Sequence, residues 1–158
     1  MTVRELMTKT AVFCRPETNL AAAGALMWEN NCGALPVVDD GQKVTGILTD
    51  RDICIALATR DRPSSQLTAG EVATGQAVVC KPEDEIHTAI AMMHNQKVRR
   101  LPVIDDQGGL EGIVSMDDIV LQAKKSNGKL TPGISYDDVV EALQAIYEHS
   151  AAHGPEVA

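Results

Sequence analysis

The chain has 158 residues, of which 44% are hydrophobic and 23% are charged, a balance typical of folded globular proteins. Its formal net charge of −8 disfavours non-specific binding to nucleic acid or to an anionic membrane surface. No apolar run approaches the ~20 residues of a membrane span, and no apolar segment typical of a signal peptide follows the start. We therefore expect a cytoplasmic protein with no nucleic-acid or membrane partner and with reduced cysteines.

The chain contains the same unit twice. A shift of 66 positions places Ala11–Pro16 on Ala77–Pro82, Leu35–Asp40 on Leu101–Asp106, and Gly46–Asp52 on Gly112–Asp118. The two copies align without a gap from residue 11 to residue 57. Such a repeat indicates two copies of one supersecondary unit. We expect a pseudo-twofold module, with a binding site that is either duplicated or built between the copies.

The elements of the first copy follow from turn residues and apolar spacing. After a short helical turn at Val3–Met7, each copy should read strand, helix, strand, strand, helix. In the first copy these are a strand at Ala11–Cys14, a helix capped by Thr18, strands at Leu35–Val38 and Val44–Leu48, and a helix from Asp50 to about Ala58. In the second copy Asp84 should replace Thr18 as the helix cap.

The predicted fold is α/β, or α+β, with the first repeat at residues 1–62 and the second at residues 63–124. Residues 125–158 form a spacer and a C-terminal helix capped by Ser135, which has no counterpart in either repeat. Cys14 and Cys80 occupy equivalent positions inside apolar runs and are expected to be buried. His149 and His153 are four residues apart but have no third ligand in view, so no metal site is expected.

The candidate site residues lie where a strand leads into a helix in each copy. Thr49 with Asp52, and Ser115 with Asp118, have the spacing of a capping box, which needs no ligand. The same atoms also suit a nucleotide, because a carboxylate can accept from the two hydroxyls of a ribose. A helix N-terminus in turn favours phosphate. The duplication of the motif in register is what favours this second interpretation.

These residues resemble a known family. The Leu-Pro-Val-Val-Asp and Leu-Pro-Val-Ile-Asp strands and the Gly-Ile-Leu-Thr-Asp-Arg-Asp and Gly-Ile-Val-Ser-Met-Asp-Asp junctions are similar to those of tandem CBS domains. The resemblance covers about three-quarters of the chain, from Val3 to Ala123. It implies a Bateman module that binds an adenosine-containing ligand in the cleft between repeats, and a homodimer of two such modules. It also assigns phosphate and ribose contacts to Thr49, Asp52, Ser115 and Asp118, and adenine contacts to Val12, Phe13, Val78 and Val79.

Basic residues distinguish the two copies. Arg99 and Arg100 precede the second Leu-Pro-Val, where the first copy has Gly33 and Ala34. Adjacent guanidinium groups can hold phosphate bidentately, although a solvated turn in an acidic protein would look the same. Arg51, between Thr49 and Asp52, is a further candidate. The sequence does not decide which site the arginine pair would serve.

The sequence thus predicts a regulatory or sensor module, not an enzyme, since no nucleophile–base pair or metal cluster is visible. Its ligand would be AMP, ADP, ATP, NAD or S-adenosylmethionine, bound for regulation with no catalytic cofactor, and its protein target is unknown. The alternative is a protein-interaction or scaffolding module with vestigial nucleotide sites.

Overall fold

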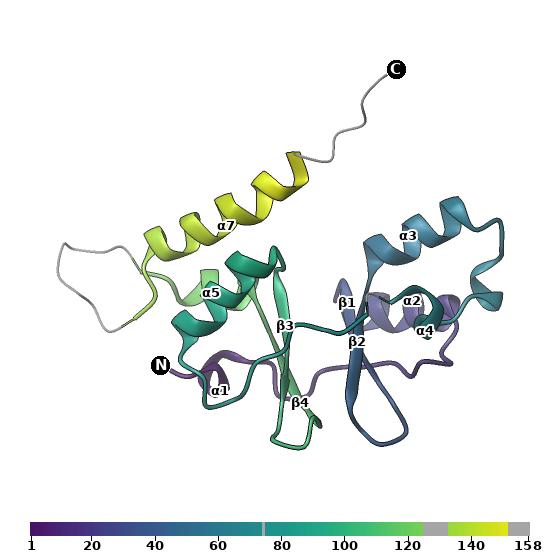
Figure 1. The fold of residues 1–158 in the computed structure, drawn as a ribbon, viewed down its shortest axis with the longest axis horizontal. Coiled ribbons are helices and arrows are strands. Elements are labelled where there is room, and N and C mark those ends of the chain that lie inside the picture. Colours follow the sequence, from purple (N-terminus) through teal and green to yellow (C-terminus); the bar gives the residue numbers. More distant parts are fainter. Residues whose placement is uncertain (74, 125–132, 152–158) are drawn as a thin grey trace. The chain divides into compact units, whose positions relative to one another are not determined.

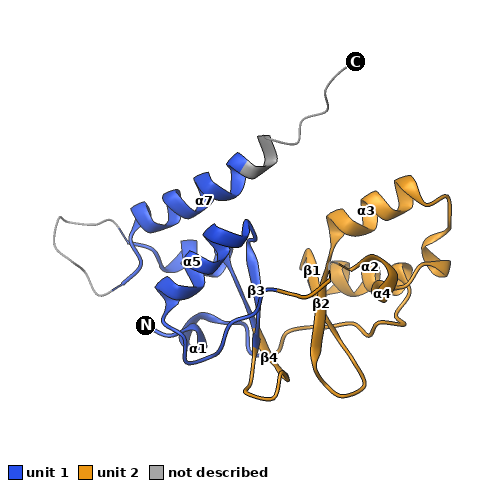
Figure 2. Cartoon of the chain, in the orientation of Figure 1, with its two compact units in different colours: residues 1–9, 78–103, 113–158 blue, residues 10–77, 104–112 orange. Residues whose placement is uncertain are grey.

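The structure, a computed structural model, describes residues 1–73, 75–124 and 133–151, and the chain divides into two compact units (Figure 2). Unit 1 comprises residues 1–9, 78–103 and 113–158, and unit 2 comprises residues 10–77 and 104–112. Within the described residues, helices combine with two two-stranded sheets, and the last element is a helix (Figure 1). The mixed fold predicted from the sequence is therefore confirmed.

Unit 2 is built around the hairpin of β1 (Ala34–Val38) and β2 (Val44–Thr49), which pair antiparallel with Leu35 opposite Leu48. The helices α2 (Leu20–Glu29), α3 (Asp50–Thr59) and α4 (Ala69–Val72) and the 3-10 turn η1 (Ser64–Gln66) complete it. Its core is aliphatic, as the near absence of aromatic residues predicts: Cys14, Leu20, Ala23, Met27, Leu35, Val37, Leu48, Ala56, Leu67 and Ala69.

Unit 1 repeats this arrangement and adds the C-terminal helix. It contains α1 (Val3–Leu6), α5 (Ile86–Gln96), α6 (Met116–Gln122), α7 (Tyr136–Ala151), and residues 100–103 and 113–115 of the hairpin of β3 (Arg100–Ile104) and β4 (Leu110–Ser115). Helix α7 packs on α5 and α6 through Val139, Ala142 and Ile146, which join the core of unit 1. The C-terminal helix thus contributes to the core of its own chain.

Each unit borrows a short helix from the other sequence repeat. Helix α1, at the start of the first repeat, packs in unit 1, where Val3 N donates to Asp84 O (2.9 Å) and Ile86 N donates to Met1 O (3.0 Å). Helix α4 makes the equivalent bonds in unit 2, from Ala69 N to Thr18 O (2.8 Å) and from Leu20 N to Leu67 O (2.9 Å). Both short helices begin with a capping box, Thr2 with Glu5 and Thr68 with Glu71.

Two sequence predictions of local structure are wrong. The segment Ala11–Cys14 forms no strand: Cys14 makes a single parallel bridge to Val37, because Pro16 follows closely and Pro36 has no N–H to donate. Asn19, not Thr18, caps α2, and its side chain accepts from Ala22 N at 2.9 Å. Thr18 and Asp84 instead close the preceding turn, accepting from the backbone N–H of Arg15 and Lys81.

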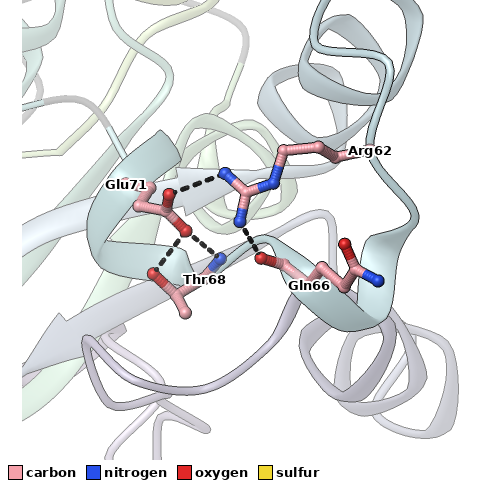
Figure 3. A network of polar contacts seen from close by, with 4 residues as sticks. All are labelled: Arg62, Gln66, Thr68 and Glu71. Atoms are coloured by element: carbon pink, nitrogen blue, oxygen red, sulfur yellow. Dashed lines mark hydrogen bonds and ion pairs between the residues drawn. The ribbon is translucent and has the colours of Figure 1, made fainter.

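The link from α3 to α4 is held by a polar network (Figure 3). Arg62 donates to Glu71 Oε1 at 2.9 Å and to the carbonyl of Gln66, while Glu71 Oε2 accepts from Thr68 N at 2.9 Å. The Arg62 guanidinium, followed by the Thr68 N–H, lowers the pKa of Glu71 to about 2. The network fixes α4 at the point where the chain enters the second repeat.

The equivalent cysteines of the two repeats are buried, as predicted. Cys14 is 2% exposed and Cys80 is 3% exposed, each in the core of its own unit. Burial raises the pKa of the Cys14 thiol to about 11, and burial, followed by nearby Asp84, raises that of Cys80 to about 12. Both therefore act as small apolar core residues with little thiolate at neutral pH.

Candidate functional site

In unit 2, the candidate site begins where β2 ends at Thr49 and α3 starts at Asp50. Asp52 Oδ2 accepts from Thr49 N (2.9 Å) and from Thr49 Oγ1 (2.7 Å), and Asp52 N donates to Thr49 Oγ1 (3.1 Å). Both side chains are partly buried. No described residue donates to the second carboxylate oxygen, Oδ1, which leaves that oxygen available to a hydroxyl donor.

Unit 1 contains the same arrangement where β4 meets α6. Asp118 Oδ2 accepts from Ser115 N (2.8 Å) and Ser115 Oγ (2.6 Å), and Asp118 N donates to Ser115 Oγ (3.2 Å). Here too, no donor among the described residues reaches Oδ1 of the carboxylate. The two junctions predicted from the repeat are therefore alike in geometry as well as in sequence.

A capping box alone does not define a site, and this chain shows why. Ser135 and Asp138 at the start of α7 make the same three bonds, at 2.8, 2.7 and 3.2 Å, and the described residues just before Ser135 form no strand. The hydrogen bond from Ser135 is the main cause that lowers the pKa of Asp138. What distinguishes Thr49 and Ser115 is their place at the end of a strand, and the box at Ser135 offers an internal control.

The N-terminus of α3 has fewer free donors than the sequence suggests. Asp50 N donates to Gly33 O (3.2 Å), Arg51 N to Asp50 Oδ1 (2.8 Å), and Asp52 N to Thr49 Oγ1 (3.1 Å). The first three N–H groups of α3 thus already have acceptors in the chain itself. Recognition of phosphate at this junction would have to rely on side chains.

Three arginines lie at the two junctions. Arg51 is exposed on the first turn of α3, Arg99 is exposed, and Arg100 is partly buried at the start of β3. The carbonyl of Arg99 accepts from Met116 N at 2.9 Å, which fixes the arginine pair beside the Ser115–Asp118 junction of its own unit. No described residue forms an ion pair with any of these guanidinium groups. Within the described part of the chain they are cations without an ion-pair partner, although the chain's net charge is −8.

The apolar candidates lie in the extended segments that precede the helices. Val12 packs against the core of unit 2 and Val78 against that of unit 1. Phe13 is 39% exposed, and its counterpart Val79 is partly buried. In both segments the inner residue thus supports the core, and the next one is open to a ligand.

The sequence prediction missed Arg15. Its guanidinium lies 5.3 Å from the centroid of the Phe13 ring and donates to the carbonyls of Val38 and Asp39. Residues two apart in an extended segment lie on one side of it, so the spacing of Phe13 and Arg15 was the available signal. The Arg15 guanidinium contacts one face of the Phe13 ring, and its bonds to the two carbonyls fix the ring beside the end of β1.

The structure thus places the predicted residues in two groups. Val12, Phe13, Thr49, Arg51 and Asp52 lie in unit 2, and Val78, Val79, Arg99, Arg100, Ser115 and Asp118 lie in unit 1. Among the described residues, no group of three or more histidines, cysteines or carboxylates could hold a metal ion. The side chain of His149 and the whole of His153 lie outside the part described.

Comparisons with known proteins agree with this duplicated arrangement. The model of the CBS domain matches residues 3–59 and again residues 69–124. The CBS domain-containing protein YhcV of Bacillus subtilis is 32% identical over 139 residues, which cover 87% of this chain and 97% of that protein. Inosine-5'-monophosphate dehydrogenase of Mycobacterium tuberculosis is 31% identical over 133 residues, but this chain spans only 24% of that enzyme.

Solved structures show the same fold. The CBS domain pair of protein MJ0100, in complex with 5'-methylthioadenosine and S-adenosyl-L-methionine, superposes with a TM-score of 0.70 and 25% identity, covering 77% of this chain and 94% of that one. CBSX2 in complex with AMP superposes with a TM-score of 0.66 and 26% identity, covering 76% and 93%. With two matched domains that together span most of its length, the chain belongs to the CBS domain family, as a tandem pair.

Proposed function

We propose that this protein is a regulatory or sensor module that binds an adenosine-containing ligand. The observation that carries the proposal is the pair of strand-end hydroxyl–carboxylate junctions, Thr49 with Asp52 and Ser115 with Asp118, alike in both units. The related CBS domain pairs of MJ0100 and CBSX2 are described with S-adenosylmethionine, methylthioadenosine and AMP. These ligands share an adenosine, so the shared part is the chemistry that we assign to the junctions.

The predicted residues suit different parts of such a ligand. The free Oδ1 of Asp52 or Asp118 can accept from a ribose hydroxyl, a charge-assisted bond stronger than a neutral one. Val12, Phe13, Val78 and Val79 would contact the base. Arg51, Arg99 and Arg100 would contact phosphates. Among AMP, ADP, ATP, NAD and S-adenosylmethionine, this arrangement favours the phosphorylated ligands at the unit 1 junction, where two arginines are adjacent.

Regulation, not catalysis, is the proposed outcome of binding. We propose that the chain acts in the cytoplasm as a homodimer, binds no catalytic cofactor, and passes its ligand state to a protein target. Within the described residues, none of the helices is long and apolar enough to cross a bilayer. The inosine-5'-monophosphate dehydrogenase that it resembles is matched over only a quarter of its length, so the likeness gives this chain no enzymatic activity.

Thermal unfolding with and without ligand tests the proposal. Asp52→Ala and Asp118→Ala each remove the third-residue carboxylate of a capping box, which should cost about 1 kcal/mol of stability. Each should also weaken binding by roughly 1.5–3 kcal/mol through the lost acceptor. Asp138→Ala is the matched control, because it removes the equivalent carboxylate from the capping box of α7. It also removes a weak contact between Asp138 and His87. It should lower stability by a similar amount and leave ligand affinity unchanged.

Two results would contradict this function. The first is that AMP, ATP, NAD and S-adenosylmethionine at millimolar concentration all leave the melting temperature unchanged. The second is that the Asp52, Asp118 and Asp138 variants all bind as the unmodified protein does, which would show that the carboxylates are helix caps only. Either result favours the alternative of a protein-interaction module with vestigial sites.

A further inference from the structure

Helix α7 has no counterpart in either repeat, and one side of it belongs to the core of unit 1. It lies along α5 (Figure 1), and its Val139, Ala142 and Ile146 are buried in that core. It also packs on α6, which begins at the Ser115–Asp118 junction. A protein bound to the outer side of α7 would therefore contact an element that packs on the helix starting at the proposed ligand site of unit 1.

The outer side of α7 carries an apolar row, the α7 stripe. Tyr136, Val140 and Tyr147 are 53%, 51% and 57% exposed. They share one side of the helix, because they are separated by four and by seven residues. The stripe covers about 16 Å of the helix axis, which is about three turns and enough to receive a second helix. Tyr136 and Tyr147 are the only two tyrosines of the chain.

An acidic residue directly follows each member of the α7 stripe. These residues, the acidic row, are Asp137, Glu141 and Glu148. Each residue turns an α-helix by about 100°, so the three carboxylates form a second row beside the stripe. All three are exposed, and no described residue forms an ion pair with any of them. The stripe is thus bordered on one side by negative charge that the described part of the chain does not pair.

A pocket between α7 and α5 lies next to the acidic row. Its lining combines the carboxylates of Asp138 and Glu141 with Ile90, Ala91 and Ala142, and with two imidazoles of α5. Lysine and arginine pack their apolar stems on such surfaces and keep the charged head near carboxylates. The acidic row thus has a hollow beside it that suits a long basic side chain.

We propose that the α7 stripe and the acidic row together are the docking site for a basic amphipathic helix of the protein target. The apolar side of that helix would pack on Tyr136, Val140 and Tyr147, as amphipathic helices commonly do in recognition. Lysine or arginine residues on its flank would contact the acidic row. We rest this inference on the protein target of the proposed function, and it specifies the surface that the target contacts and the charge of the contacting helix.

Charge selects this occupant among the classes that could cover an apolar stripe. An anionic bilayer or a nucleic acid would bring negative charge to the acidic row. A second copy of this chain has the same net charge of −8, so its approach is opposed as well. A polypeptide helix that carries lysine or arginine instead gains charge-assisted bonds to the carboxylates.

The two tyrosines make the test specific to this surface. Incorporation of fluorotyrosine into the full chain places both fluorine NMR signals in the α7 stripe. The probe is a synthetic peptide of about 18 residues, long enough to be helical, with leucine on one side and lysine on its flanks. The matched control peptide has glutamate at every lysine position. We expect the leucine–lysine peptide to move both signals and the leucine–glutamate peptide to bind at least about tenfold more weakly.

Charge reversal tests the acidic row itself. Glu141→Lys combined with Glu148→Lys should weaken binding of the leucine–lysine peptide at least about tenfold and remove its preference over the leucine–glutamate peptide. Glu17→Lys combined with Glu29→Lys is the control, because it changes the net charge equally at exposed positions of unit 2. The control should bind the peptide as the unmodified protein does.

A second variant tests the stripe and does not depend on charge. Tyr147→Ser shortens the apolar row, assigns the two signals and leaves Tyr136 as the reporter. It should weaken binding of the leucine–lysine peptide several-fold. Because Glu141, Tyr147 and Glu148 are exposed, all variants should melt near the temperature of the unmodified protein.

Four results would overturn the proposal. The leucine–lysine peptide could leave both signals unmoved up to millimolar concentration. The two peptides could bind equally, which would show an apolar contact without charge selection. The control double variant could lose as much affinity as Glu141→Lys with Glu148→Lys, which would show that only net charge matters. Finally, the signals could move with protein concentration as the mass doubles, or with anionic phospholipid vesicles alone, which would assign the stripe to a second copy or to a membrane.

A parallel thermal-shift titration with AMP distinguishes the failure of this inference from the failure of nucleotide binding. Stabilisation by AMP without binding of the leucine–lysine peptide overturns the docking site alone. Binding of the peptide without stabilisation by any of the adenosine ligands overturns the nucleotide site alone.

Discussion

At the scale of single residues, the two junctions differ in the charge that they can offer a ligand. Unit 1 has Arg99 and Arg100 beside Ser115, without an ion-pair partner among the described residues. Unit 2 has Gly33 and Ala34 at these positions, and the side chain of Asp50 occupies the Arg51 N–H. Each helix start also carries one further carboxylate, Asp50 in unit 2 and Asp117 in unit 1, so the arginine pair is the feature for which we propose unit 1 as the phosphate site.

Replacing Arg99 and Arg100 together by Gln should therefore weaken phosphorylated ligands much more than adenosine. Guanidinium groups act on phosphate charge, whereas Asp118 and the apolar segments act on ribose and base. Each lost contact should be worth about 1.5–3 kcal/mol if the ligand buries it, and much less if it stays exposed. Calorimetric titration of adenosine, AMP and ATP into both proteins measures the difference.

Arg51→Gln is the matched comparison at the other junction, and we expect it to have the smaller effect on ATP. An equal loss for adenosine and ATP in the double variant would show that the arginines shape the site instead of recognising phosphate. If added salt reduces the preference for ATP, the contacts are exposed, because exposed charges are screened.

At the scale of elements, α4 depends on an ion pair whose strength should follow pH. Arg62, followed by Thr68, lowers the pKa of Glu71 from its ordinary value of 4.5 to about 2 (Figure 3). A depressed carboxyl pKa stabilises the fold above about pH 4.5, and the contribution is lost as pH falls towards 2. Arg62→Gln should therefore lower the melting temperature slightly at neutral pH, and the difference from the unmodified protein should shrink below about pH 4.5.

Arg60→Gln, two residues earlier and also exposed, is the control and should show no such pH-dependent difference. Glu71 is exposed, so added salt should reduce the effect of Arg62→Gln at neutral pH. A constant difference from neutral pH down to 2 would contradict the ion pair and assign the effect to the bond between Arg62 and the Gln66 carbonyl.

The elements also show how far local pattern predicts structure. The predicted strands Leu35–Val38 and Val44–Leu48 are confirmed within a residue at each end, because apolar runs bounded by turn residues carry their own signal. Segment Ala11–Cys14 has similar composition but forms only one bridge, since its partner strand has Pro36 at the next pairing position. Whether a segment pairs as a strand depends on its partner strand, so the sequence of the segment alone does not predict it.

The candidate site was predictable to a similar degree. The hydroxyl–carboxylate bonds of Thr49 with Asp52 follow from a three-residue spacing, which is local. Helix α4 was missed although Thr68 and Glu71 repeat Thr2 and Glu5 at the same shift, because a four-residue helix has almost no periodicity. The contact of Arg15 with the carbonyl of Val38 joins residues far apart in sequence and required the fold.

At the scale of the whole molecule, the path of the chain couples the repeats. Val3, fully buried in the core of unit 1, comes from the first repeat, and Leu67, fully buried in the core of unit 2, follows the first repeat and precedes α4. The core of each unit is therefore completed by a segment from outside its own repeat. A chain cut between the two repeats would leave both cores incomplete.

Amide hydrogen exchange in two matched variants tests whether each N-terminal segment stabilises the unit in which it packs. Val3→Ala should cost about 1–3 kcal/mol and should speed amide exchange in α5, whose Ile86 N–H is bonded to Met1 O, while α2 stays protected. Leu67→Ala should cost about 2–5 kcal/mol and do the reverse, since Leu20 N–H is bonded to Leu67 O. If each sequence repeat instead folded on its own N-terminal segment, Val3→Ala would loosen α2 and leave α5 protected. Equal loosening of α2 and α5 in both variants would show that the two units open as one, because only separately opening units can exchange at different rates.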